Sequence, residues 1–598
     1  MCGISAIFRY KSLFENDKLN LRLMNEEMAY RGPDDRGTWF DDHCGMAQVR
    51  LSIIGLEKGK QPLFNEDKSL VLICNGEIYN YIELKKELQS KGHHFSSYSD
   101  SETILHLYEE SGEKCLNQLR GQYSFCLYDV RKRQLFAARD RIGEKTLYYT
   151  QVPGGVVFST ELKAILKNYI SKPQVNLRQL AAPIRYTCPL HTSDTFIEQI
   201  KRLEPGHYLL AGETGIRKYR YWKRYTEPAF TGTVQEAKQE TLRLMQESVD
   251  ISLRSDVPVA VMLSGGIDSS TIAALAKETG REVHTITAGY RGDHDCDERE
   301  TAKRFAKEKG LIYHEIELNE KDFRDCFEEF TLHIDEPITD SAALAQWALY
   351  KKTKELGFKV LLGGMGGDEL FYGYPYWNEL AKSLSLHRQH QSLFPWNSVK
   401  KKMNYLRFLS RHWKYMLYAG YPLQIRDQSV CWWMNEDYNK FARQASFEFD
   451  GHFHRFCEED LYFSFGNCNP GRELDLVYDF SFDFIMTMAY LYLSDREGMG
   501  NSLEIRSPLL DYKLVEFVSS LPQHIKYIDG QPKYFMKQVV QGLIPGYIIN
   551  GTKKGFTPPK GFINDVVKNY HYKFFSADHK FYNSILADRL LTLLLKQR

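Results

Sequence analysis

The stretch VPVAVMLSGGIDSSTIAALA, residues 257–276, decides the fold of the second half of the chain. Its first part, 257–263, is apolar throughout and runs into the turn SGG at 264–266, which is the pattern of a buried strand that ends in a tight loop. A helix follows from about Asp268, and its free backbone N–H groups and its dipole favour an anion at the end of the strand. The glycines allow close approach and the serine hydroxyls add donors. The stretch therefore predicts a pyrophosphate-binding loop.

Strand-like and helix-like segments alternate around this stretch. Such alternation is typical of a doubly wound parallel sheet covered by helices. Because parallel strands place their carboxyl ends at one edge of the sheet, loops that follow different strands can form one site. The strand-like segments are 257–263, 283–289, 311–318 and 358–363, and the helix-like segments are 242–253, 269–280, 298–310 and 341–357.

A second glycine-rich loop lies in FKVLLGGMGGDELFYGY, residues 358–374. No Lys-Ser or Lys-Thr pair follows its glycines, so it is not a Walker loop. We expect its Asp368 to share a metal ion with Asp268, because both loops leave the same edge of the predicted sheet. Further along, Lys533 in GQPKYFMKQVV offers a positive charge for a triphosphate. Met365, at the centre of the loop, has no proton chemistry and needs an explanation.

The first part of the chain, up to about residue 205, is rich in strand-like segments with β-branched and aromatic residues. Helix-like segments at 81–92 and 101–120 interrupt them, which indicates an α+β layered domain. Short polar segments that contain glycine follow, and we interpret residues 206–232 as a linker between two domains.

The chain begins Met-Cys-Gly, and a small second residue normally permits removal of the initiator methionine. Cys2 would then carry its own α-amino group, whose reference pKa of about 7.7–8.0 suits it to take the thiol proton and return it. This is the N-terminal version of a nucleophile with its base. For an amide substrate with an α-carboxylate and an α-ammonium, Arg50 and Asp100 can bind the two charges. Asn75 and Gly76 can donate hydrogen bonds to a tetrahedral oxyanion.

Composition excludes several classes of protein. Lys plus Arg (78) nearly cancels Asp plus Glu (77) in the 598 residues, so no overall field draws the chain to nucleic acid or to an anionic membrane. The eleven cysteines include no C-x-x-C pair, which argues against a zinc motif or a disulfide framework and favours the reducing cytoplasm. The start shows no secretory signal, and the apolar run at 484–493 is about half of the roughly 20 residues that a membrane span needs.

Taken in order, the motifs resemble those of the glutamine-hydrolysing asparagine synthetases, over nearly the whole chain. Lys533 is followed by Pro545 at the spacing usual in that family. The other matching motifs are MCGI (1–4), YRGPDD (30–35), RLSIIGL (50–56), CNGEIYN (74–80), SDSE (99–102), RDRIGEKTLYY (139–149), FSTELKAI (158–165), LSGGIDSS (263–270), GGDELFYGY (366–374) and SLEIRSPLLD (502–511).

The resemblance implies a glutaminase domain of the N-terminal nucleophile type, an αββα sandwich, over 2–205. It also implies a synthetase domain of the ATP-pyrophosphatase type, with a doubly wound parallel sheet and a helical C-terminal part, over 233–598. Transferred by motif, the catalytic residues are Cys2, Asn75 and Gly76, and the glutamine-binding residues are Arg50, Ile54, Glu77 and Asp100. The ATP-binding residues are Leu263, Ser264, Gly265, Gly266, Asp268, Ser269, Ala288, Gly364 and Lys533, with Asp268 and Asp368 as ligands of Mg²⁺.

The activity implied is amidation of a carboxylate through an acyl-adenylate, with glutamine as nitrogen donor and ATP cleaved to AMP and pyrophosphate. Ammonia would pass from one site to the other inside the protein. The partners expected are therefore small molecules, namely glutamine, ATP and a carboxylate acceptor, without nucleic acid and without a membrane span. A homodimer is compatible with the resemblance.

One departure from the family concerns the acceptor. The position of Met365 is commonly Glu or Asp in the family, and a positioned acid or base is worth about 10²–10⁴ in rate. Three explanations stay open: Asp335, Glu336 or Tyr372 supplies the missing group, the acceptor is a different carboxylate, or the synthetase half is inactive. Tyr372 itself stands where glycine is usual.

Aspartate, giving asparagine, is the expected acceptor. The main alternative is a sugar uronic acid of the kind found in bacterial surface polysaccharides such as O-antigen. Five of the eight tryptophans lie between Trp377 and Trp433, in an aromatic-rich insertion near 385–470 that packs beside the second domain or binds a sugar. A non-catalytic binding protein with the same fold is a third interpretation, but packing alone does not require the full set of polar site residues.

Overall fold

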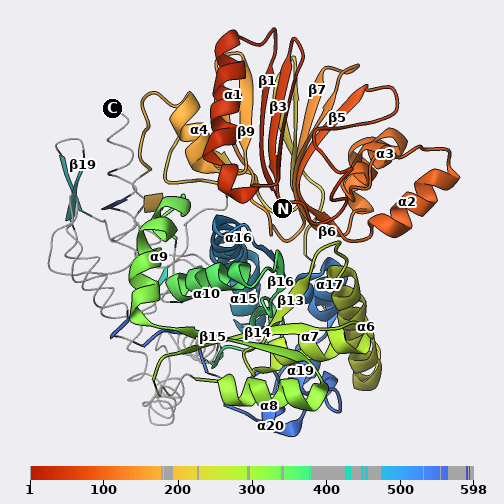
Figure 1. The fold of residues 1–598 in the computed structure, drawn as a ribbon, viewed down its shortest axis with the longest axis vertical. Coiled ribbons are helices and arrows are strands. Elements are labelled where there is room, and N and C mark those ends of the chain that lie inside the picture. The colour runs from red at the N-terminus through yellow and green to blue at the C-terminus, as the bar shows by residue number, and fades with distance from the viewer. Residues whose placement is uncertain are drawn as a thin grey trace, which may run out of the picture.

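A computed structural model gives the fold of the chain (Figure 1). It describes residues 2–176, 179–180, 193–224, 228–292, 297–338, 342–375, 378, 381, 424–426, 429–431, 446–449, 452–455, 473–528, 531–552, 554–559, 561–562, 588–589 and 592. The expected aromatic-rich insertion near 385–470 lies almost entirely outside these residues, apart from two short hairpins. Those hairpins pair β17 (Gln424–Arg426) with β18 (Ser429–Cys431) and β19 (Ser446–Phe449) with β20 (His452–Arg455).

The first domain contains two antiparallel sheets that face each other. One sheet has the order β10-β8-β9-β1-β3-β2, and Cys2, the first residue of β1, pairs with Arg50 on the neighbouring strand. Its strands are β1 (Cys2–Arg9), β2 (Asp35–Phe40), β3 (Cys44–Arg50), β8 (Tyr148–Val152), β9 (Gly155–Ser159) and β10 (Lys201–Arg202).

The second sheet has the order β12-β11-β7-β6-β5-β4. Its strands are β4 (Leu63–Phe64), β5 (Leu70–Ile78), β6 (Gly121–Asp129), β7 (Gln134–Arg139), β11 (His207–Gly212) and β12 (Gly215–Arg220). Residues 206–232 are therefore not simply a linker, because 207–220 add a hairpin to the edge of this sheet. The polar, glycine-containing sequence belongs to the edge strand β12, in which no residue is buried.

Helices cover the outer faces of both sheets, which completes the αββα sandwich. Apolar side chains such as Ile4 and Val71 fill the space between the sheets. The outer layers are α1 (Glu15–Glu27) and α4 (Leu162–Tyr169) on one side, with α2 (Tyr81–Ser90) and α3 (Glu102–Ser111) on the other. The helix expected over 101–120 ends at Ser111, because Gly112 adopts φ of 57° and a 3-10 turn, η2 (Gly112–Asn117), follows.

The second domain is built on a parallel sheet of order β15-β14-β13-β16-β21. Its strands are β13 (Val259–Met262), β14 (His284–Tyr290), β15 (Ile312–Leu318), β16 (Val360–Leu362) and β21 (Glu504–Arg506). The chain moves outward in one direction from β13 to β15 and then returns to β16 on the other side. The switch point therefore lies between β13 and β16, and the loops after these two strands meet at the carboxyl edge.

Helices lie on both faces of the parallel sheet, in two apolar layers. They are α6 (Val234–Ser252), α7 (Ile267–Glu278), α8 (Arg299–Lys309), α9 (Glu320–His333), α10 (Ala343–Glu355), α11 (Gly367–Leu370), α15 (Glu473–Phe480), the π-helical η4 (Ser481–Tyr490), α16 (Leu491–Gly500), α17 (Tyr512–Ser520), α18 (Gln523–Lys526), α19 (Tyr534–Val539) and α20 (Gly546–Ile549). Two further 3-10 turns are η1 (Ala29–Arg31), in the first domain, and η5 (Pro508–Leu510). Among the described residues, no helix is long and apolar enough to cross a membrane.

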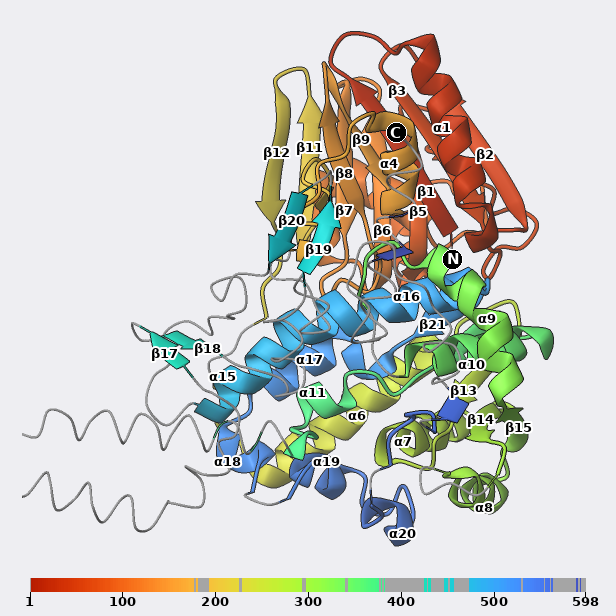
Figure 2. The same cartoon turned by 90° about the vertical axis from the view of Figure 1, so that its left-hand side faces the viewer.

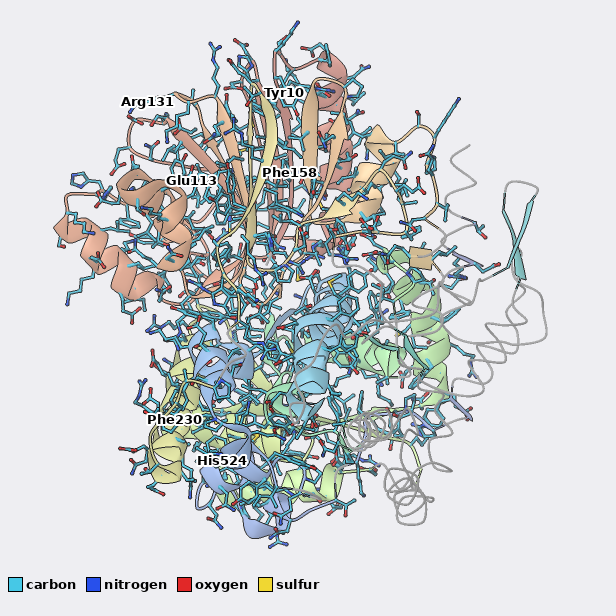
Figure 3. The ribbon with its side chains drawn as sticks, turned by 180° about the vertical axis from the view of Figure 1, so that it is seen from behind. Tyr10, Glu113, Arg131, Phe158, Phe230 and His524 are labelled. Atoms are coloured by element: carbon cyan, nitrogen blue, oxygen red, sulfur yellow. The ribbon has the colours of Figure 1, made fainter. Side chains whose placement is uncertain are left out.

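The two domains pack directly on each other. Leu51, Ile53 and Ile54 of the first domain belong to the same apolar cluster as α6 and α7 of the second. Figure 1 shows the amino terminus at this boundary, and Figure 2 shows α16 running along the base of the sandwich. From behind, Phe158 lies within the sandwich, whereas Phe230 and His524 lie in the other domain (Figure 3). The start of β1 is thus presented to the second domain.

Candidate active sites

Cys2 lies at the beginning of β1, where its side chain is 5% exposed. Its backbone N–H donates to Asn75 Oδ1 at 3.0 Å, across the space between the two sheets. Burial raises the pKa of the Cys2 thiol, so the thiol needs a nearby base to become a nucleophile. An α-amino group at this position would serve as that base, at the same atom that now bonds Asn75.

Asn75 and Gly76 follow each other near the end of β5. Because Asn75 Oδ1 accepts from Cys2, its amide nitrogen points elsewhere, and this buried Nδ2 has no hydrogen-bond acceptor within the described part of the chain. Gly76 has φ of 146°, and a Cβ there would lie 2.0 Å from the carbonyl oxygen of Gln122. An unsatisfied buried donor beside a nucleophile is what an oxyanion hole requires.

The glutamine-binding residues predicted from the sequence surround the same point. The Arg50 guanidinium donates to the carbonyl oxygens of Ile54 and Gly55, each at 2.9 Å, which fixes its position in the loop after β3. Asp100 Oδ2 accepts from the backbone N–H of Ile78 at 2.6 Å. The backbone of Ile54 thus holds Arg50, while its side chain packs toward the second domain.

Two buried carboxyl groups, Glu77 and Asp100, lie close enough to repel each other. Burial, and after it the charge of Asp100, raises the pKa of Glu77 well above its usual range. Burial also raises the pKa of Asp100. A cationic group that enters this space would relieve both effects, which fits a site for an α-ammonium. Arg506, whose Nη2 lies 3.7 Å from Glu77 Oε1, already supplies one positive charge from the second domain.

The loop 264–266 of the second domain joins a strand to a helix, as the sequence predicts. Ser264 Oγ and Ser269 Oγ lie 3.0 Å apart, and the N–H of Ser264 donates to Ser269 Oγ at 3.1 Å. Gly265 has φ of 76°, and α7 begins two residues later at Ile267. The turn therefore aims the first free N–H groups of a 12-residue helix at the carboxyl edge of the sheet.

Asp268, Asp368 and Lys533 come together at the switch point. Lys533 Nζ contacts Asp268 Oδ2 and lies 2.9 Å from Asp368 Oδ1. Burial lowers the pKa of the Lys533 ammonium, but the charges of the two aspartates outweigh that effect and raise this pKa above its usual value. The carboxylates are hard oxygen donors on adjacent loops, and as a donor set they fit a Mg²⁺ ion.

The glycines of the second loop make room for this arrangement. A Cβ at Gly367 would lie 2.3 Å from Asp268 Oδ1, and a Cβ at Gly364 would lie 2.9 Å from the Cβ of Asp268. A side chain at either position would push Asp268 away from Asp368. The glycine density of this stretch thus serves the approach of two loops as well as the approach of a ligand.

A cavity of about 410 Å³ opens at this edge of the sheet. Of the ATP-binding residues predicted from the sequence, Leu263, Ser264, Asp268, Ser269, Ala288 and Gly364 line it, together with Asp368. Gly265 and Gly266 are not among its lining residues, and Lys533 contacts the two aspartates from outside the lining. Other lining residues are Glu298, Gln346, Tyr350, Met365, Glu369, Tyr374, Tyr490, Lys554 and Phe556.

Met365 lines this cavity, but the three residues suggested as its substitutes do not. Asp335 accepts from the N–H of Leu162 at 2.7 Å, and Glu336 accepts from the Tyr148 hydroxyl at 2.9 Å, so both face the first domain. Tyr372, held at φ of 56°, donates to Asp475 at 2.6 Å. Interaction partners at the domain boundary and in the helical layer therefore occupy all three side chains.

Glu369 is an acid in the cavity that sequence reasoning missed. It lines the same cavity as Met365, and its Oε1 accepts from the Tyr374 hydroxyl at 2.6 Å. Burial, and after it the charge of Asp368, raises the pKa of Glu369 to about 7. The GGDEL motif contains Glu369, but the sequence does not show that its side chain is buried. Burial raises its pKa and so distinguishes it from Asp368 as a candidate proton donor.

A layer of buried charges lies between the two sites and was also missed. Arg31 Nε donates to the carbonyl oxygen of Cys2 at 3.1 Å, while its Nη atoms bind Glu161 at 2.9 Å and Asp495 at 2.9 Å. Arg496, on α16, contacts Glu161 from the second domain. YRGPDD and FSTELKAI supply two of these residues, but nothing in the sequence pairs them with α16. Arg31 therefore connects Cys2, at the start of β1, with Asp495 on α16 of the second domain.

Comparison with known proteins agrees with this architecture. The family model of a glutamine amidotransferase domain matches residues 1–222, and that of asparagine synthase matches residues 240–592. Asparagine synthetase [glutamine-hydrolyzing] 1 of Bacillus subtilis is 30% identical over 597 residues, which cover 95% of this chain and 89% of the relative. Amidase chyE of Penicillium rubens is 29% identical over 619 residues and covers 94% and 89%.

A solved structure of the glutamine phosphoribosylpyrophosphate amidotransferase from Bacillus subtilis aligns with 52% of this chain and 65% of its own at 16% identity, but its TM-score of 0.28 is too low for a comparison of folds. The two family models define the class: the chain is a glutamine-dependent carbon–nitrogen ligase. More specifically, it belongs to the asparagine synthase family, in its glutamine-hydrolysing form.

Proposed function

We propose that Cys2 hydrolyses glutamine and that the ammonia released amidates a carboxylate activated by ATP. The observation that carries the first half is the bond from the Cys2 N–H to Asn75 Oδ1, which leaves the Asn75 amide nitrogen buried and available. Cys2 Sγ would attack the glutamine amide carbon while its proton passes to the α-amine. The oxyanion would accept hydrogen bonds from Asn75 Nδ2 and the N–H of Gly76.

Collapse of that intermediate releases ammonia, with the proton returned by the α-amine, and leaves a thioester on Cys2. Water then attacks the thioester carbonyl to give glutamate and the free thiol. Arg50 and the pair of Glu77 and Asp100 would bind the α-carboxylate and the α-ammonium of glutamine. Their raised carboxyl pKa values support this role, because a bound cation stabilises the ionised form.

In the second half, an acceptor carboxylate oxygen attacks the α-phosphorus of ATP, and pyrophosphate leaves. The loop 264–266 and Ser269 would hold the pyrophosphate portion, and Lys533 would neutralise charge that develops on it. Asp268 and Asp368 would hold a Mg²⁺ ion, whose charge would offset that of the phosphates. Ammonia then attacks the acyl carbon of the acyl-adenylate, which yields the amide and AMP.

L-Aspartate is the acceptor that we propose first, because several relatives, including two from Bacillus subtilis, are named asparagine synthetases. Met365 in the cavity favours a second candidate, a different carboxylate such as a sugar uronic acid. The nearby Glu369 reduces the force of that argument, since its carboxyl, with a pKa raised to about 7, supplies an acid to the same cavity. Aspartate therefore remains the first choice.

Pyrophosphate release, measured with ATP, Mg²⁺ and ammonium while the acceptor is varied, tests the proposal. We expect aspartate to stimulate release, and amide formation from ¹⁵N-ammonium to match it. Stimulation by a uronic acid or its nucleotide-linked form, but not by aspartate, would transfer the function to the second candidate. If no carboxylate stimulates pyrophosphate release, the amidation proposal fails.

A further inference from the structure

A cluster of two histidines and two glutamates lies on the side of the first domain that α2 and α3 cover, apart from both sites (Figure 1). We call Glu66, His93, His106 and Glu109 the His-Glu cluster. Glu66 lies in the turn between β4 and β5, His93 between α2 and α3, and the other two one helical turn apart on α3. Each residue offers one ligand atom, and the four atoms lie within 4.8 Å of one another.

The distances between these atoms approach those around a small tetrahedral metal ion. Glu109 Oε2 lies 3.2 Å from His106 Nδ1 and 3.4 Å from His93 Nδ1. Glu66 lies 3.7 Å from His106 Nδ1 through Oε2 and 4.0 Å from His93 Nδ1 through Oε1. Ligands bonded at about 2.0–2.2 Å in a tetrahedron are separated by about 3.3–3.6 Å, so only small side-chain movements close the shell.

Further polar groups lie behind the four ligands, and they bond His93, Glu66 and Glu109 directly. His106 Nε2 lies 3.7 Å from Glu102 Oε1, and His93 Nε2 lies 3.1 Å from Glu110 Oε1. Each histidine thus turns one ring nitrogen to the cluster and the other to a carboxylate, as metal-bound histidines do. Among the outer partners of the glutamates, Asn65 Nδ2 donates to Glu109 Oε1 at 2.8 Å and the His94 N–H donates to Glu66 Oε1 at 2.9 Å.

Burial and access also fit a bound ion. The side chain of His106 is fully buried, and that of His93 is 12% exposed. Glu66 borders a surface cavity of about 560 Å³, which gives an ion a route from solvent. Two neutral histidines and two carboxylates together balance the charge of a divalent cation. We propose that the His-Glu cluster binds one divalent ion of the zinc class, with nitrogen and oxygen ligands in tetrahedral geometry.

Such an ion would fasten three separate segments to one another. It would tie the β4–β5 turn and the segment before α3 to α3 itself, and the residue two positions before α3 is Asp100. The ion would therefore stabilise the end of the sandwich that holds Asp100 against the N–H of Ile78. We expect a structural role, because all four ligand positions of the ion come from the protein.

Equilibrium dialysis of the full-length chain against Zn²⁺, without nucleotide, tests the site, with bound metal counted by elemental analysis. The parent protein for this experiment is Cys2→Ala, and every variant is made in that background, so that this thiol binds no metal. We expect about one high-affinity Zn²⁺ per chain, lost or weakened at least ~10-fold in His93→Gln and in Glu109→Gln. These two ligands are partly exposed, so their substitution leaves the buried His106 in place.

His314→Gln is the matched control, because His314 Nε2 lies 2.9 Å from His284 Nδ1 in a histidine pair of the second domain. It should bind Zn²⁺ like the parent protein. Zn²⁺ should also raise the Tm of the parent and the control but not that of Glu109→Gln. Equal binding by the parent and both cluster variants, or no tight binding by the parent, would overturn the proposal and leave the cluster as an ion-pair network.

Discussion

At the scale of single residues, the side-chain oxygen and the side-chain nitrogen of Asn75 have different functions in the proposed site. Its oxygen accepts from the backbone N–H of Cys2, and in the proposed reaction its buried nitrogen would donate to the substrate. An alanine at this position removes both, while the strand around it keeps its pairing with β6. The geometry therefore separates an effect on the transition state from an effect on the fold.

We predict that Asn75→Ala lowers the kcat of glutamine hydrolysis by about 10²–10³, which is the usual effect of losing one oxyanion donor. The KM for glutamine should change little, because Arg50 and Asp100 bind the other end of the substrate. Steady-state glutamate release measures both constants. A large rise in KM at unchanged kcat would instead assign Asn75 to ground-state binding.

Glu369 gives a prediction about pH and stability. Its pKa is raised to about 7 in the folded protein, so on raising the pH the unfolded chain loses this proton first, near pH 4.5. Stability should therefore fall between about pH 4.5 and 7, by up to about 3 kcal/mol from this group. Glu369→Gln should remove that part of the slope, as measured by Tm across this range.

Glu298→Gln, at another carboxyl that lines the cavity, serves as the control for that measurement. Identical pH slopes in the wild type, Glu369→Gln and Glu298→Gln would contradict the raised pKa of Glu369.

At the scale of elements, the switch point between β13 and β16 determines where the ATP chemistry can occur. Parallel order and the meeting of the two loops were predicted from strand–helix alternation, because that signal is local in sequence and long in extent. The hairpin of β11 and β12 was missed, because polar edge strands resemble a linker. Glu369 was missed because its raised pKa comes from burial, which sequence spacing does not encode. Asp335 and Glu336 were wrongly suggested as substitutes for Met365 because their partners lie across the domain boundary, far away in the sequence.

Two loop variants test the switch point. Gly367→Ala would place a Cβ 2.3 Å from Asp268 Oδ1, which is too close for a non-bonded contact, and so displace the Asp268 carboxylate. We predict a loss of acceptor-dependent pyrophosphate release in Gly367→Ala and in Asp368→Asn, because both disturb the same pair of carboxylates. Glutamine hydrolysis should be retained in both variants. Normal pyrophosphate release by Asp368→Asn would remove Asp368 from the proposed metal site.

At the scale of the whole molecule, the two candidate sites are joined by the buried charges at the domain boundary. Arg31, Glu161 and Arg496 have no exposed side-chain surface, so each charge depends on its partners. Removal of one partner from a buried ion pair costs about 3–5 kcal/mol, because the remaining charge stays unpaired. Neither domain is therefore expected to keep its boundary structure without the other.

We predict that Asp495→Ala, which strips Arg31 of one carboxylate, destabilises the protein by about 3–5 kcal/mol. The change should appear as a lower Tm by calorimetry. Lys167→Ala, which breaks the more exposed pair with Glu27, is a control expected to cost less than about 1 kcal/mol. Similar losses of stability in both variants would mean that the buried charges contribute no more to stability than an exposed ion pair.

Glutamate release from glutamine, with the amino terminus of each protein verified by mass spectrometry, tests whether nitrogen is liberated at Cys2 and used at a separate ATP site. We expect release by the wild type and by Asp268→Asn but none by Cys2→Ala. Equal release by Cys2→Ala and the wild type, with the initiator methionine removed from both, would contradict this expectation.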